Sequence, residues 1–270
     1  NQLKKMANGC VTINNKNMPK ILGVQFTGID WVGAITTIKE YLAGEQVRYV
    51  FTPNPEMVVD AQRDKYFLDT LNAGDLNVCD GSGVALLARI PKVAGVDLAE
   101  EICRLAAEQG KSVYLLGTGS AKSVEIAAIH LRTRFPNIKI VGTDPGYLIS
   151  MEPSAGGAHL KYDALAHEET LNRIIMAAPD VLLVAFGHNK QEKWIVEFAH
   201  QIPSLKIAMG VGGTLSYWAG TARRAPVFMR KLGLEWLWRL ILEPTRIGRI
   251  LKATVVFPAL FLFSKFKSRV

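Results

Sequence analysis

The chain has 270 residues, of which 49% are hydrophobic and 21% charged. This length and composition fit one large folded domain with an appendage and exclude wholesale disorder. Three widely spaced cysteines, Cys10, Cys79 and Cys103, form no C-x-x-C pair. They argue against a zinc site and a disulfide framework, and they indicate a reducing, cytoplasmic setting. The first residues are polar, so we expect a flexible segment over 1–20 and no secretory signal.

The net charge of +8 is unevenly distributed along the chain. Residues 221–270 contain eleven Lys and Arg against two Glu, a net of +9, so the rest of the chain carries a net of −1. A basic segment on a nearly neutral body requires an acidic partner. The classes of partner that the charge leaves open are nucleic acid, a phosphate-bearing ligand and an anionic membrane.

Short apolar runs alternate with helical patterns in the body of the chain. The runs that predict strands are 47–52, 76–79, 112–117, 139–142, 180–187 and 205–210. Asn54 and Pro55 suit the N-cap and first position of a helix that extends to about residue 71, and Asp97 is predicted to cap a helix through 109. Further helices are expected over about 84–90, 121–135 and 190–200. This alternation predicts an α/β catalytic domain over 21–220, with a Rossmann-like, doubly wound, mostly parallel sheet.

Two segments depart from the alternation. Residues 150–163, "SMEPSAGGAHLKYD", are rich in Pro and Gly and predict a mobile loop, either a lid or an insertion without function. After Gly220 the chain becomes basic, aromatic and helical, so 221–270 is expected to be a separate appendage. Its uncharged stretch 253–263, flanked by basic residues, is too short to cross a bilayer and is typical of a helix lying on an anionic membrane. The alternative is a helix packed on the body or on another subunit.

Small and polar residues follow several of the predicted strands. In an open α/β sheet, ligands bind outside the carboxyl ends of the strands, so we expect most of these residues to share one rim. The candidate binding residues of the body are Thr52, Asn54, Gly81, Gly83, Arg89, Gly117, Thr118, Gly119, Gly187, Gln191, Glu192, Gly212 and Gly213.

Asp80 stands between the apolar run "LNVC" and the turn "GSG". It either caps the following helix or acts as a general base, because a carboxylate at a strand end can take a proton from a sugar hydroxyl. Glu192 is a second acid at the rim, or simply a residue of a helix's first turn.

The turn "GTGSAK" at 117–122 matches the first two glycines of a dinucleotide fingerprint, but Lys122 replaces the third small residue and no acid closes the next strand. An NAD-dependent oxidoreductase is therefore disfavoured. The turn is either a phosphate cradle of backbone N–H groups or a tight turn.

The sequence contains no D-x-D motif and no pair of acids at metal-ligand spacing, so we expect neither a metal nor another cofactor. A leaving diphosphate would then need cationic side chains. The appendage contains Arg223, Arg224, Arg230, Arg239, Arg246 and Arg249. A non-catalytic, basic-tailed binding module is the remaining alternative; nucleic acid is disfavoured as a partner because long apolar runs interrupt the basic residues.

Several motifs occur together and in order: "FTPNPEMVVDAQRD", "NVCDGSGVALLAR", "VAGVDL", "GYL", "KQEKW", "GVGGTLSYWAG" and "RRAPVFMRKLGLEWLWRLILEPTR". With them, the chain from about residue 22 to 249 resembles the bacterial WecG/TagA/CpsF glycosyltransferases. The resemblance implies an inverting, metal-independent enzyme that moves a sugar, N-acetylmannosamine in the teichoic acid branch, from a UDP-sugar to undecaprenyl-diphosphate-GlcNAc. A transferase for UDP-ManNAcA or UDP-glucuronic acid is the alternative.

The same resemblance implies roles for individual residues. Asp80 falls on the catalytic aspartate, and Arg224 falls on the arginine of the family's R-A-P motif. In the mechanism that we expect, arginines of the appendage stabilise the leaving diphosphate, Arg224 first, with Arg230, Arg239 and Arg246 as further candidates. The remaining matched family positions are Thr52, Asn54, Gln191 and Glu192. The expected location is peripheral, on the cytoplasmic face of the cell membrane, with self-association through the apolar tail as a further expectation. The chain departs from the family pattern at His188 and Asn189, where a small residue and a proline are usual, and in the length of 150–163.

Overall fold

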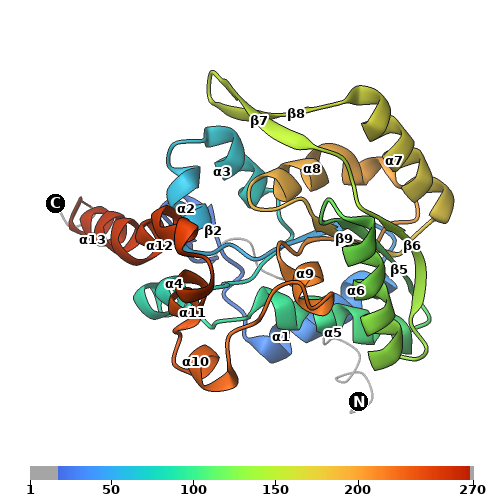
Figure 1. The fold of residues 1–270 in the computed structure, drawn as a ribbon. Coiled ribbons are helices and arrows are strands. Elements are labelled where there is room, and N and C mark those ends of the chain that lie inside the picture. The colour runs from blue at the N-terminus through green and yellow to red at the C-terminus, as the bar shows by residue number, and fades with distance from the viewer. Residues whose placement is uncertain (1–17, 268–270) are drawn as a thin grey trace, which may run out of the picture.

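The computed structural model describes residues 18–267. Its sheet contains β3 (Arg48–Phe51), β4 (Leu76–Asn77), β5 (Ser112–Gly117), β6 (Lys139–Asp144), β9 (Val181–Ala185) and β10 (Ile207–Gly210). The strand order is β4-β3-β10-β9-β5-β6, and every neighbouring pair is parallel. Helices cover both faces (Figure 1), so the predicted Rossmann-like fold is confirmed. Residues 1–17 of the predicted flexible segment lie outside the described residues.

The two faces of the sheet bury separate apolar clusters because successive side chains of a strand point to opposite faces. In β9, Leu183 packs into one cluster, and Leu182 and Val184 pack into the other. The helices of the first face are α1 (Trp31–Ala43), α5 (Gly95–Glu108), α6 (Ala121–Arg134) and α9 (Thr214–Trp218). The helical elements of the second face are α7 (Ala164–Ala177), α8 (Lys190–Phe198) and η2 (Ala199–Gln201).

The segment between β3 and β4 forms two helices, where the sequence predicted one. Asn54 caps α2 (Pro55–Ala61) as expected, since its Oδ1 accepts a hydrogen bond from the N–H of Met57 at 3.0 Å. A new N-cap follows at Asp64, whose Oδ1 accepts from the N–H of Phe67 at 2.8 Å and begins α3 (Lys65–Asn72). These helices form a third apolar cluster with the antiparallel pair β1 (Lys20–Ile21) and β2 (Val24–Gln25), and with α4 (Ser82–Ala88).

The predicted loop over 150–163 is wrong, because this segment is an antiparallel hairpin of β7 (Ile149–Ser154) and β8 (Gly157–Tyr162). Its turn contains Gly156 with φ +89°. A fully buried lysine holds the tip: Lys193 Nζ donates to the Ala158 carbonyl at 2.5 Å and pairs with the Asp64 carboxylate at 2.7 Å. These contacts come from distant parts of the chain, which is why local composition failed here.

The C-terminal segment, defined here as residues 221–267, is helical as predicted. Its elements are α10 (Val227–Lys231), α11 (Glu235–Leu242), η3 (Pro244–Arg246), α12 (Ile247–Leu251), the π-helical turn η4 (Lys252–Val256) and α13 (Phe257–Lys267). Phe257 and Phe261 are buried in the third cluster, so the segment packs on the body beside α2 and α4 (Figure 1). By length and composition alone, Pro244–Phe266 is long and apolar enough to cross a membrane. Only 17% of its most apolar window is buried.

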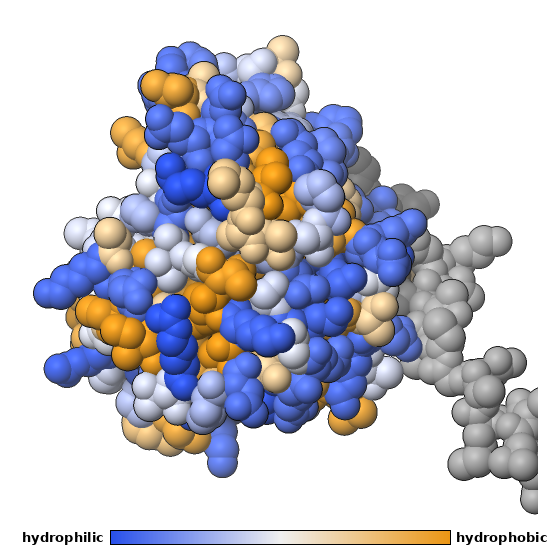
Figure 2. Space-filling model, turned by 90° about the vertical axis from the view of Figure 1, so that its right-hand side faces the viewer, coloured by the Kyte–Doolittle hydropathy of each residue, from blue (hydrophilic) through white to orange (hydrophobic). Residues whose placement is uncertain are grey.

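The outer side of the C-terminal segment exposes large apolar side chains. They include Phe228, Leu232, Trp236, Ile241, Ile247, Leu251, Val255, Leu262, Phe263 and Phe266. The face of the molecule at the right of Figure 1, which carries α6 and α7, is different: hydrophilic side chains cover most of it, with smaller apolar groups between them (Figure 2). The exposed apolar side chains of α12 and α13 lie on the other side of the molecule, at the left of Figure 1.

Candidate active site

A polar cleft of about 680 Å³ opens at the carboxyl ends of the sheet strands, the position expected for ligands of such folds. It brings together predicted residues that follow β3, β4, β5, β9 and β10, with two arginines of α11 and η3. The predicted residues that line it are Thr52, Asn54, Asp80, Thr118, Gly119, Gly187, Gln191, Glu192, Gly212, Gly213, Arg239 and Arg246.

An apolar groove of about 520 Å³ lies between α4 and the C-terminal segment. Its apolar lining includes Leu86, Leu87, Leu232, Trp236 and Ile250, and the predicted residues Gly81 and Gly83 lie here instead of in the polar cleft. The groove and the cleft share Asn54, Asp80, Arg239, Arg246 and Arg249. Asp80 therefore stands where a polar chamber and an apolar chamber meet.

Asp80 does not cap the helix that follows it. The N-cap of α4 is Gly81, and no side chain caps this helix. Gly81 has φ +124°, and a Cβ added to it would lie only 2.8 Å from Pro55 Cδ, so this position requires glycine. The carboxyl group instead accepts a hydrogen bond from the N–H of Gly95, the first residue of α5. A Cβ on Gly95 would lie 3.0 Å from Thr52 Oγ1 and 3.3 Å from Asp80 Oδ2, so glycine allows this close approach. The cap alternative for Asp80 is therefore wrong, and the general base stays a prediction.

The environment of Asp80 disfavours its charged form. Burial raises its pKa to about 6, Glu235 adds to the increase, and the nearby Arg239 acts in the opposite direction. A carboxyl group with this pKa is ionised at neutral pH and is basic enough to accept a proton from a reacting hydroxyl.

Gln191 and Glu192 form the floor of the cleft at the start of α8. The Gln191 amide donates to Glu192 Oε1 at 2.7 Å, and its Oε1 accepts from the N–H of Gly212 at 2.9 Å. Both side chains are buried, and burial raises the pKa of Glu192. Glu192 Oε2 has no hydrogen-bond partner among the described residues, so it is available to a ligand in the cleft.

The turn after β5 lines the cleft but offers few backbone donors. The N–H of Thr118 is directed at the Ala185 carbonyl at 3.3 Å, and the N–H of Gly119 donates to the Pro145 carbonyl at 3.0 Å. The N–H of Ser120 bonds to Thr118 Oγ1 at 3.3 Å. Because these donors are already engaged, the geometry favours the tight turn over the phosphate cradle.

Four predicted binding residues lie outside the lining of both chambers. Arg224 forms a bidentate pair with Asp97, at 2.6 and 2.9 Å, and Arg230 donates to the Ala225 carbonyl. Arg89 ends α4 in the left-handed conformation. The remaining residue, Gly117, packs against the backbone of Ala185, where an added Cβ would lie only 2.7 Å away. Asp97 is also not the cap predicted for α5, which begins at Gly95.

The cleft also contains residues that the sequence reasoning did not single out. They include Gly95, Gly146, Tyr147, Lys190, Ser216 and Tyr217, while Arg249 and His188, which the sequence had already singled out, line the cleft as well. Gly95 and Tyr147 belong to the motifs "VAGVDL" and "GYL", which gave a signal at the sequence level. The hydroxyl of Tyr147 accepts from Trp194 Nε1 at 2.7 Å, and this bond fixes one wall of the cleft.

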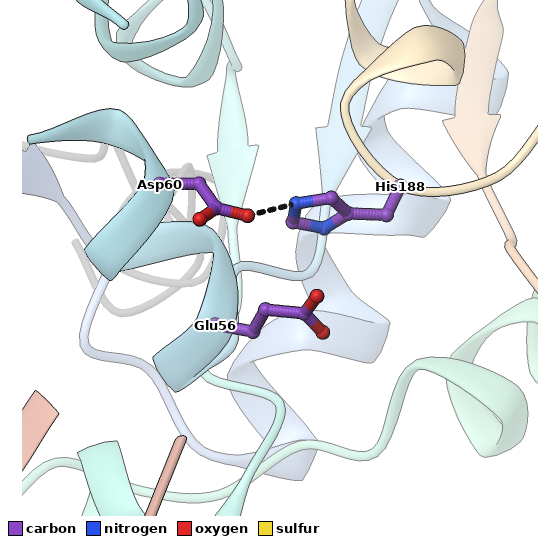
Figure 3. A group of neighbouring side chains, drawn as sticks. All are labelled: Glu56, Asp60 and His188. Atoms are coloured by element: carbon purple, nitrogen blue, oxygen red, sulfur yellow. Dashed lines mark hydrogen bonds and ion pairs between the residues drawn. The ribbon is translucent and has the colours of Figure 1, made fainter. Parts of the chain in front are cut away.

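One group among residues 18–267 has metal-ligand chemistry. Glu56, Asp60 and His188 bring their ligand atoms within 4.8 Å of one another beside the cleft (Figure 3). Each carboxylate already has a cationic partner, since Glu56 pairs with Arg249 at 2.7 Å and Asp60 pairs with Lys252 at 2.6 Å. The charge of the group is therefore matched by protein side chains.

Comparison with known proteins adds independent information. The family model described as "Glycosyl transferase WecG/TagA/CpsF family" matches residues 19–270. Proteins of Staphylococcus aureus strains NCTC 8325, COL and MSSA476 are each 34% identical to this chain over 248 residues, which cover 88% of this chain and 89% of theirs. Each of these relatives is named N-acetylglucosaminyldiphosphoundecaprenol N-acetyl-beta-D-mannosaminyltransferase.

Proposed function

Because the chain belongs to the WecG/TagA/CpsF family of glycosyl transferases, we propose that it transfers N-acetylmannosamine from UDP-N-acetylmannosamine to undecaprenyl-diphosphate-GlcNAc. The activity for which the S. aureus relatives are named supports the acceptor and the transferred sugar. The observation that carries the proposal is the position of Asp80, a carboxylate shared by a polar cleft and an apolar groove. One chamber suits a nucleotide sugar and the other a lipid chain.

The reaction is a single displacement. The Asp80 carboxylate takes the proton of the acceptor hydroxyl as that oxygen forms a bond to the anomeric carbon. The bond between the anomeric carbon and the UDP oxygen breaks on the opposite face, so the configuration inverts. UDP leaves with the electron pair of that bond, and Asp80 later releases its proton to solvent.

Negative charge develops on the leaving diphosphate, and cationic side chains stabilise it. Arg239, Arg246 and Arg249 line both chambers, which makes them the candidates for this role. Arg224 is engaged with Asp97 outside both chambers and instead braces the segment against α5. We propose that the three arginines perform the task that a divalent metal performs in other glycosyltransferases.

The lipid part of the acceptor occupies the apolar groove and continues into the membrane. The groove opens beside exposed apolar residues such as Leu86, Leu232 and Trp236. The net charge of +9 over residues 221–270 favours an anionic membrane. The enzyme is accordingly proposed to act on the cytoplasmic face of the membrane, attached peripherally through its C-terminal segment.

A donor screen tests the function. The full chain is mixed with a short-chain polyprenyl-diphosphate-GlcNAc and with UDP-ManNAc, UDP-ManNAcA or UDP-glucuronic acid, and released UDP is measured. We expect release from UDP-ManNAc only when the acceptor is present, and binding of UDP without binding of NAD. Faster turnover of a uronic acid donor would overturn the proposed donor, and the absence of transfer with every donor would overturn the proposed reaction.

Filling the groove is expected to weaken acceptor binding selectively. Ala253 lines the groove, so Ala253→Phe should occupy space that the lipid needs. Loss of contact with two methylene groups corresponds to roughly a tenfold higher KM for a long-chain acceptor, since each buried methylene contributes about 0.8 kcal/mol. UDP affinity should not change. The matched control is Ala259→Phe on the exposed side of α13, and equal KM values in the two variants would contradict the assignment of the groove.

A further inference from the structure

Asp60 on α2 is contacted from two parts of the chain that are distant in sequence. His188 Nε2, in the loop after β9, lies 2.9 Å from Asp60 Oδ2 (Figure 3). Lys252 Nζ, at the first residue of the π-helical turn, lies 2.6 Å from the other carboxylate oxygen. The Asp60 and His188 side chains are 22% and 19% exposed and the Lys252 side chain is 42% exposed, so the contact with His188 is the more shielded of the two. Burial acts to raise the pKa of Asp60, but the contacts with His188 and Lys252 outweigh this effect and hold the pKa below its usual value.

A second ion pair lies one helical turn away. Glu56 precedes Asp60 by four residues on α2, and Arg249 precedes Lys252 by three residues, so both pairs join the same two helical faces. Glu56 Oε1 lies 2.7 Å from Arg249 Nε. The two carboxylates and two cations form a ladder between α2 and the C-terminal segment.

The ladder connects to both sides of the active site. His188 and its neighbour Gly187 line the polar cleft, and Arg249 lines the cleft and the groove. Lys252 lines neither chamber. A change at Lys252 therefore has no direct contact through which to affect a nucleotide, and any effect must pass through Asp60 or through the position of the C-terminal segment.

We propose that Asp60 couples the docking of the C-terminal segment to the order of the cleft loop 187–190. His188 and Lys252 are positioning residues that share one carboxylate, so each stabilises the arrangement that the other requires. Because such coupling is reciprocal, a nucleotide that orders the loop also strengthens docking of the segment that carries Arg249. The proposal rests on the proposed function only in taking UDP as the ligand of the polar cleft.

UDP titration of the full chain by calorimetry tests the coupling without relying on turnover. Lys252→Met is expected to weaken UDP binding about threefold to tenfold, because contacting residues couple through shared partners. In a His188→Ala background the same change should have less than about a twofold effect, since the link is already broken. His188→Gln, which keeps an N–H donor, should restore the sensitivity to Lys252→Met.

The matched control is Lys231→Met, which removes the same charge from an exposed site with no ion pair among the described residues. It should leave UDP affinity unchanged. An equal effect of Lys252→Met with and without His188 would overturn the coupling, as would an equal effect of Lys231→Met.

Hydrogen exchange of residues 247–256 in the unliganded protein provides a readout that does not depend on UDP. His188→Ala should accelerate exchange there although His188 lies outside this segment, and Lys231→Met should not. Failure of the wild-type chain to bind UDP would contradict the proposed function and leave the exchange result as the test of the coupling. Unchanged exchange in His188→Ala would overturn the coupling itself.

Discussion

Replacing Asp80 by Asn is expected to lower kcat by about 10²–10⁴, because the amide cannot accept the proton of the attacking hydroxyl. The side chain keeps its shape and one acceptor oxygen, so the hydrogen bond from Gly95 can persist. UDP affinity should therefore remain near that of the wild type. Steady-state kinetics with lipid acceptor and UDP titration measure the two quantities separately. A variant with normal turnover would show that the base is another group.

The pH profile identifies the same group independently. Since burial raises the pKa of Asp80 to about 6, the fraction of ionised carboxylate, and with it kcat/KM, should fall as the pH drops through this value. Asp80→Asn should lack this acidic limb. Asp69→Asn, a change at an exposed acid of α3, should retain both the limb and full activity. A limb that persists in Asp80→Asn would belong to a different residue.

Replacing Arg239 by Met is expected to lower kcat by about 10²–10³, the usual effect of removing one donor that stabilises transition-state charge. Arg239 lines both chambers and is the strongest of the nearby charges that lower the pKa of Asp80. The variant should therefore also move the acidic limb of the pH profile to higher pH. A loss of activity without this shift would indicate a purely structural defect.

The control for this prediction is Arg223→Met, which removes the same charge from an exposed residue that lines neither chamber. It should keep the kcat and the pH profile of the wild type on a short-chain acceptor. Full activity of Arg239→Met on that acceptor would contradict the role of the arginine in the chemical step.

The arginines of the polar cleft come from a different part of the chain than Asp80 and Glu192. Among the described residues, every arginine that lines the polar cleft belongs to the C-terminal segment. The body supplies Asp80, Lys190, Gln191 and Glu192, and the segment supplies the three arginines proposed to stabilise the leaving diphosphate. The site is therefore assembled by docking one part of the chain on another, and the ladder at Asp60 holds the two parts together.

Much of the fold follows from local sequence. The apolar runs of β5 and β9 and the helices between them have the alternation of parallel βαβ units, and Asn54 with Pro55 begins α2 as their side chains dictate. The carboxyl ends of parallel strands meet at one edge, so the rim that gathers Thr52, Asp80 and Gln191 could also be anticipated.

Other features depend on contacts that no local pattern contains. Lys193 and Asp64, from elsewhere in the chain, hold the hairpin of β7 and β8. Its composition alone predicted a loop. The appendage contains several arginines of equal local character, and only packing decides that Arg224 faces Asp97 while Arg249 faces the cleft. The sequence by itself determined the order of the strands of the parallel sheet along the chain and the presence of a carboxylate near a strand end. The tertiary structure decided which cations reach that carboxylate and how burial raises its pKa, because distance and desolvation arise only when remote segments pack together.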